Sequence, residues 1–135
     1  MAPRRPKFEY SMICDDIREE KGNKLTLVGV YPHNILVPNF PFTFAKLCFL
    51  FSYKGVKSGD TFLMQLTGPS GKEIGPAIKG HVGQAIKRSS RFMALAILSP
   101  LVADEEGLYN MLVTFNDDDN NKQEISFNIN QQDNT

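Results

Sequence analysis

The sequence predicts an all-β protein, most simply an antiparallel sandwich of two sheets with about eight strands. Three observations predict this fold. Short runs in which apolar and polar residues alternate recur along the chain. Gly, Pro, Asn and Asp separate these runs at short intervals, as turns between strands require. No run has the spacing of an amphipathic helix, so a sandwich or barrel is favoured over alternating strands and helices.

Length and composition indicate one globular domain. The 135 residues can bury a two-layer core, and 41% of them are apolar. We expect only residues 1–6 and 131–135 to be flexible. The 15 basic residues equal the 15 acidic ones, so no overall field attracts nucleic acid, and nucleic-acid binding is not expected.

The sequence predicts a cytoplasmic protein. No apolar segment of a signal peptide follows the charged start, and the longest apolar stretch, residues 47–51, is far below the roughly 18 residues that span a bilayer. Membrane insertion is therefore not expected. Cys14 and Cys48 lie in apolar runs, which is typical of buried thiols in a reducing compartment rather than of a disulfide framework.

The N-terminal runs predict a hairpin. Residues 8–14 alternate as a strand, residues 18–23 form a polar turn, and residues 24–31 form a second strand that Pro32 ends. In this hairpin the end of the first strand would face the start of the second. We therefore expect residues 14–16 beside residues 24–26, with Tyr31 and His33 near Phe8.

The middle of the chain predicts an edge strand followed by a central one. Residues 35–37 are confined to an edge or a crossover, because the nearby prolines have no backbone N–H to donate to a neighbouring strand. Residues 42–53 carry apolar side chains on both parities, which indicates burial on both faces or a dimer contact. Residues 61–67 then form a further strand before a turn at residues 68–71.

The last part of the chain predicts four more strands, at residues 77–82, 91–98, 107–115 and 125–129. A helix over residues 91–98 is possible, but Pro100 and the short length favour a buried strand. Tyr109 follows Gly107 in the manner of a tyrosine corner, whose phenol bonds to upstream backbone and which would support a Greek-key or jelly-roll-like order; simple core packing of Tyr109 is the alternative.

Three N-terminal segments resemble an uncharacterised family of small bacterial proteins. They are Cys14-Asp15-Asp16-Ile17-Arg18, the run from Gly22 to Tyr31 that includes Val28-Gly29-Val30, and Val37-Pro38-Asn39-Phe40-Pro41. The resemblance implies a bacterial, stand-alone β-sandwich with no known activity. It carries over no catalytic or binding residue, so it supports the fold and leaves the function open.

The candidate catalytic and metal-binding residues have plain structural explanations. A nucleophilic pair of Cys14 with His33 fails in the expected hairpin register, and Asp15 and Asp16 suit a turn. Zinc ligands Cys14, Cys48, His33 and His81 lack the close paired spacing of structural zinc sites. Residues 116–121 have the composition of a calcium loop without the required Gly and Glu, which favours a solvated hairpin tip. The sequence therefore predicts no catalytic residue, metal or cofactor.

Two candidate binding surfaces remain. A basic stretch without acidic residues is the best anion site, although a solvated rim also explains it; it contains Lys79, His81, Lys87, Arg88 and Arg91. An aromatic, proline-rich edge is the candidate partner surface, with Phe40, Phe42, Phe49 and Phe51.

The sequence favours a non-catalytic binding or assembly module that recognises a protein partner or itself. The alternatives are a small-ligand or anion-binding sandwich, possibly a small enzyme, and a carbohydrate-binding module. The carbohydrate module is the weaker alternative, because the chain has no Trp and only 4 Tyr.

Overall fold

The computed structural model of the chain describes residues 6–32, 34–83 and 91–133, and all the regular structure in these ranges is β-strand. It has 11 strands in these ranges, rather than about eight. They are β1 (Lys7–Glu20), β2 (Lys24–Tyr31), β3 (Asn34–Val37), β4 (Phe42–Phe44), β5 (Leu47–Lys54), β6 (Thr61–Thr67), β7 (Glu73–His81), β8 (Phe92–Leu98), β9 (Leu101–Ala103), β10 (Gly107–Phe115) and β11 (Lys122–Gln131).

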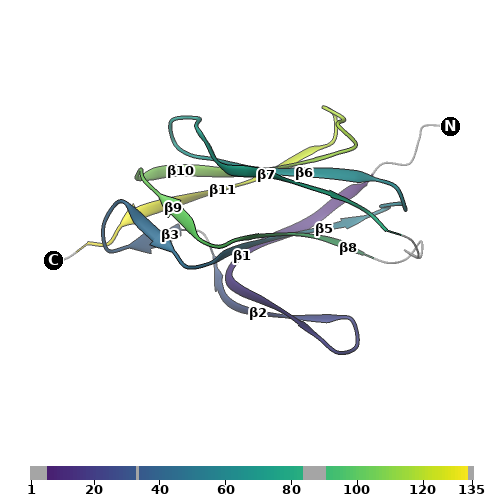
Figure 1. Ribbon diagram of the computed structural model, residues 1–135, viewed down its shortest axis with the longest axis horizontal. Coiled ribbons are helices and arrows are strands. Elements are labelled where there is room, and N and C mark those ends of the chain that lie inside the picture. Colours follow the sequence, from purple (N-terminus) through teal and green to yellow (C-terminus); the bar gives the residue numbers. More distant parts are fainter. Residues whose placement is uncertain (1–5, 33, 84–90, 134–135) are drawn as a thin grey trace.

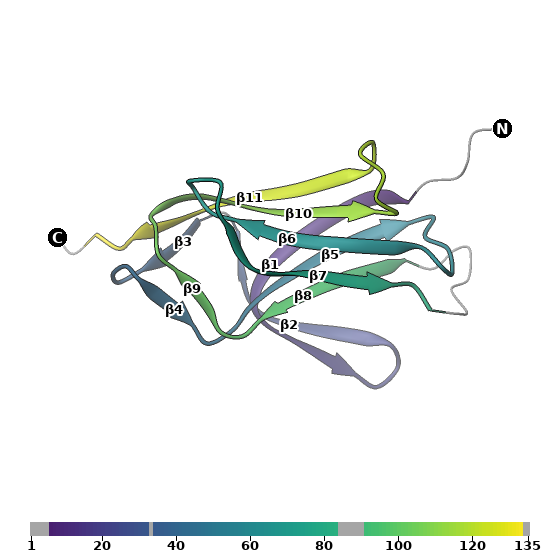
Figure 2. The same ribbon diagram turned by 45° about the horizontal axis from the view of Figure 1, so that its top comes forward.

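Two open sheets pack face to face, as the sequence predicts (Figure 1). One sheet has the order β2-β1-β5-β8, and the other has the order β3-β11-β10-β6-β7. The short strands β4 and β9 form a small third sheet at one end (Figure 2). All pairings are antiparallel except that of β3 with β11, which is parallel.

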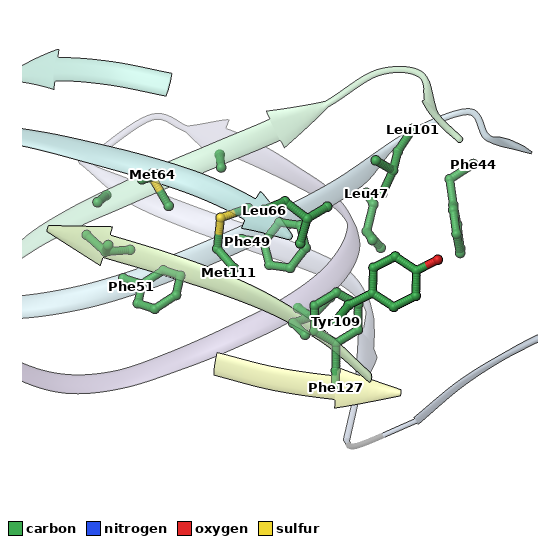
Figure 3. Close-up of a cluster of buried hydrophobic side chains, with 14 of the residues drawn as sticks. Phe44, Leu47, Phe49, Phe51, Met64, Leu66, Leu101, Tyr109, Met111 and Phe127 are labelled. Atoms are coloured by element: carbon green, nitrogen blue, oxygen red, sulfur yellow. The ribbon is translucent and has the colours of Figure 1, made fainter. Parts of the chain in front are cut away.

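The main core fills the space between the two large sheets (Figure 3). Alternate residues of β5 and β10 point into it, because successive side chains of a strand point to opposite faces. Aromatic rings connect the layers: Phe49 and Phe127 have ring centroids 5.6 Å apart, and Phe127 stacks on Tyr109 at 5.8 Å. Such pairs add about 1 kcal/mol each beyond the burial of their area.

A second, smaller core covers the outer face of the four-stranded sheet. Cys14, Ile17, Cys48 and Leu50 are buried there, and Leu25, Leu27, Met93 and Leu95 pack against them. The hairpin of β1 and β2 projects from the sandwich on this side (Figure 1). The apolar residues on both parities of β5 are therefore explained by burial on both faces.

Several strands differ from the sequence-based expectation. Residues 42–53 form two strands in different sheets, and β4 pairs with β9, a three-residue strand too short to show a pattern. Strand β7 begins at Glu73 rather than at residue 77, because an edge strand tolerates Gly75 and Pro76. Strand β1 continues through the polar residues expected to form a turn.

Residues near both ends of the described ranges make hydrogen bonds to the sandwich. Pro6 is buried, and its carbonyl oxygen accepts a bond of 3.1 Å from the Asn121 side chain. Gln131 pairs with Val37, and the backbone amide of Gln132 donates to the carbonyl of Val37 at 2.7 Å. Residues 1–5, 134 and 135 lie outside the described ranges.

The tyrosine corner is confirmed. Tyr109 is 1% exposed, and its hydroxyl donates a hydrogen bond of 2.5 Å to the backbone carbonyl of Glu105, four residues upstream. This bond fixes the position at which the chain enters β10. The residues of β10 that alternate with Tyr109 and its buried neighbours face the solvent side of the sheet.

We expect Tyr109→Phe to lower the free energy of unfolding by about 1 kcal/mol, because it removes this bond and keeps the buried ring. Urea unfolding of the purified chain measures the change. Tyr10→Phe, at a residue 39% exposed, is the matched control and should leave stability unchanged. Equal stability of wild type and Tyr109→Phe would contradict the role of the bond.

Candidate functional site

The hairpin register brings Asp15 next to Tyr31, which the sequence-based register did not. Strand β1 runs on to Glu20, which faces Lys24 across the turn. Cys14 consequently faces Val30, and Ile13 faces Tyr31. The expectation that residues 14–16 lie beside residues 24–26 is therefore wrong, because the polar end of β1 pairs with β2 instead of forming a loop.

Asp15 and Tyr31 form a hydrogen bond at this position. The Tyr31 hydroxyl donates to Asp15 Oδ1 at 2.5 Å. Burial of the ring, reinforced by the neighbouring carboxylate, raises the pKa of Tyr31 to about 12. Tyr31 therefore stays protonated at neutral pH and acts as a donor, not as a base.

Gly29 makes room for the Asp15 side chain. It has a φ of 68°, which an L-residue with a Cβ rarely adopts, and a Cβ there would collide with the Asp15 carboxylate. The Val-Gly-Val run of β2 therefore has a local reason: glycine lets the carboxylate lie over the neighbouring strand and reach Tyr31.

Asp16 is held by three donors. Lys46 Nζ lies 3.1 Å from Oδ1, Arg18 Nε lies 3.4 Å from Oδ2, and the backbone amide of Ile17 donates to Oδ1 at 2.9 Å. The bond from Lys46 is the largest cause that lowers the pKa of Asp16 below its ordinary value of 3.8. Asp16 thus ties the turn of β1 to the segment between β4 and β5.

The two cysteines face each other across β1 and β5, and both are free thiols with no exposed surface. Burial raises the pKa of Cys14 to about 11 and also raises that of Cys48. Since the thiolate is the nucleophile, these protonated thiols are poorly suited to catalysis. His33, the sequence-based partner of Cys14, lies outside the described residues.

A surface groove lies beside this network, and we call it the Tyr31 groove. Its lining residues come from β1, β2, β3 and the segment from β4 to β5; they are Asp15, Tyr31, Leu36, Val37, Phe42, Thr43, Phe44, Ala45 and Lys46. Leu36 is 61% exposed, whereas Tyr31 and Phe42 are half-buried. The groove therefore has an apolar floor between an acidic rim at Asp15 and a basic rim at Lys46.

Only part of the sequence-predicted partner surface reaches solvent. Phe49 and Phe51 are completely buried in the main core, so they are not surface residues. Phe40 and Phe42 are half-buried and pack against that core, and Phe42 also lines the Tyr31 groove. No sequence pattern indicates Leu36 as a groove residue, because the pairing of β3 with β11 brings it there. Tyr31 lies in an aromatic, proline-containing stretch, but its position in the groove depends on the hairpin register.

The candidate anion site is only partly assembled in the described residues. Lys79 and His81 of β7 line one depression, together with Asp117. Arg91 is bound by Glu9, with Nε 2.9 Å from Oε1, and Lys54 also lies 3.5 Å from that carboxylate. Lys87 and Arg88 lie outside the described residues.

The candidate metal ligands do not come together in the described residues, where no group of three or more His, Cys, Asp or Glu side chains is placed to hold a metal ion. In the loop after β10, Asp119 pairs with Lys122 at 3.1 Å, and Asp118 Oδ1 accepts the backbone amide of Asn120 at 2.9 Å. This loop has the bonding of a solvated hairpin tip.

The fold and the groove define a β-sandwich domain with a small surface groove of mixed polarity. The chain belongs to DUF6941, a family of unknown function, whose profile matches residues 9–130. Among curated proteins, no match is found. Within the described residues, no helix is long and apolar enough to cross a membrane.

We expect Asp16→Asn to destabilise the chain at pH 7 and to have a smaller effect at pH 3. A lowered pKa in the folded state means that the charged carboxylate adds stability above its ordinary pKa of 3.8 and loses it as the pH falls through the folded value. Urea unfolding of wild type and variant across this range measures the difference.

Lys46→Gln should give the same pattern, because it removes the cation that contributes most to the lowered pKa. Lys21→Gln, at the exposed hairpin turn, is the control and should not alter the dependence. A constant difference between wild type and Asp16→Asn from pH 7 to pH 3 would show that the charge of Asp16 is not involved.

Proposed function

We propose that this domain is a non-catalytic binding module that receives an apolar side chain of a partner protein in the Tyr31 groove. The observation that carries the proposal is the exposure of Leu36, 61%, beside the half-buried rings of Tyr31 and Phe42. An exposed aliphatic side chain in a concave, partly aromatic site is a favourable place for an apolar anchor.

The rigidity of the groove supports this proposal. Strand β3 is paired with β11, and β4 is paired with β9, so both walls belong to sheets. The bond from Lys46 to Asp16 and the bond from Tyr31 to Asp15 tie the rims together. A groove held in this way loses little conformational entropy when a partner binds.

The state of the ionisable groups favours binding over catalysis. Tyr31 and both cysteines stay protonated at neutral pH, and Asp16 is already bonded to two cations. The exposed carboxylate of Asp15 suits a basic residue next to the anchor of the partner. Two buried thiols accord with the reducing cytoplasm, which we include in the proposal as the location.

The alternative functions have weaker support. An anion site at Lys79 and His81 would contain the carboxylate of Asp117, and Arg91 is already paired with Glu9. A carbohydrate module usually offers an exposed aromatic platform, whereas the solvent-facing residues of β10 are Leu108, Asn110, Leu112 and Thr114.

Site-specific photo-crosslinking tests the proposal. A benzophenone amino acid placed at Leu36 in the source cells should give a discrete adduct with another protein, because the partner contacts this residue. The same amino acid at Leu108, which is 46% exposed on β10, is the matched control and should give none. Mass spectrometry identifies the adduct.

A second substitution ties the adduct to the groove. Phe42→Ala, combined with the probe at Leu36, should reduce the adduct at least about tenfold, since it removes part of the apolar floor. Circular dichroism shows whether the fold is retained. Adducts of equal yield from Leu36 and Leu108, or no adduct from Leu36, would rule out the groove as the binding site.

A further inference from the structure

Strand β8 is an apolar strand at an open sheet edge. It lies at the end of the order β2-β1-β5-β8 and pairs only with β5 among the described residues. All seven of its residues are apolar: Phe-Met-Ala-Leu-Ala-Ile-Leu, from Phe92 to Leu98. Ile97 is 49% exposed. An exposed edge of this kind offers unpaired backbone groups to another strand.

The other three outer strands of the two large sheets are protected against such pairing. Strand β7 contains Gly75, with a φ of 70°, followed by Pro76. Strand β3 has only four residues. Strand β2 begins with Lys24 and is distorted at Gly29. Proline, short length, charge and local twist are the usual devices that block edge pairing, and β8 contains none of them.

The sequence of β8 is nearly palindromic about Leu95. If two copies pair antiparallel about this residue, Leu95 faces its own copy and Ala94 faces Ala96. Met93 then faces Ile97, and Phe92 faces Leu98. Each pair joins residues of similar size, so both faces of the joined sheet stay level and apolar.

The charged residue beside β8 also favours antiparallel over parallel pairing of the two copies. In the antiparallel arrangement Arg91 faces Ser99 of the other copy, whereas in a parallel one Arg91 would face Arg91. Like charges directly opposite each other destabilise a strand pair. The antiparallel pairing also joins Met93, Leu95 and Ile97 to their counterparts, so that the small outer core continues across the two chains.

We infer that two copies of this chain associate through antiparallel pairing of β8 with β8, centred on Leu95, to form one continuous eight-stranded sheet. The inference goes beyond the proposed partner groove, because it assigns a second interface at the opposite edge of the four-stranded sheet. The occupant is a second copy because the residues of β8 complement themselves.

Sedimentation velocity from micromolar to millimolar protein tests the association. Wild type should form a dimer, and Ile97→Lys should weaken it at least about tenfold, since symmetry places two lysines in the interface. Val102→Lys is the matched control, at a residue 44% exposed on β9, and should not change the dimer. A monomer throughout, or a dimer that Ile97→Lys leaves intact, would overturn the inference.

Disulfide trapping tests the register. Under a mild oxidant, Leu95→Cys should give a covalent dimer, because residues directly opposite each other lie within disulfide reach. Ile97→Cys should give none, since its counterpart is four residues away along the strand, about 13 Å. The native cysteines, Cys14 and Cys48, are fully buried, so they should not form disulfides between chains in this experiment. Trapping at position 97 but not at 95 would refute the pairing.

Discussion

Burial of β5 on both faces is the constraint on which the rest of the structure depends. The side chains on one face of this strand pack against the five-stranded sheet. Those on the other face must be covered by different residues. The cover comes from the hairpin of β1 and β2, whose Ile17, Leu25 and Leu27 pack on the outer face. To reach that position β1 must leave β5 near Cys14 and continue with β2 alone. The bend that satisfies the core therefore also places Asp15 beside Tyr31 and opens the groove.

Charged residues at this bend hold a fixed arrangement. Asp16 bonds to Lys46 and Arg18 on one side of the bend, while Asp15 accepts a hydrogen bond from the Tyr31 hydroxyl on the other. Neither carboxylate lies in the main core, so the network orients strands at the surface and adds little to the stability of the interior. The network holds Asp15, Tyr31 and Lys46 in place, and all three line the groove.

The sequence predicted correctly those strands that have one buried face and one solvent-exposed face. The bounds of β6 and β10 follow directly from this alternation, and the two-parity pattern of β5 indicated its burial on both faces. The candidate site was not predictable in the same way, because it depends on register. A polar run such as Arg18–Glu20 is compatible with a loop or with an exposed ribbon, and the choice shifts every pairing of the hairpin. Short strands such as β9 carry too few residues to form a pattern.

The parallel pairing of β3 with β11 has a consequence for the order of folding. It joins Asn34–Val37 to residues 128–131, so one wall of the groove depends on a contact between segments 94 residues apart in the sequence. Ile35 and Val37 belong to the main core, and they gain this neighbour only when the pairing forms. Because contacts between distant segments form more slowly than local ones, this wall is completed after the local hairpin of β1 and β2.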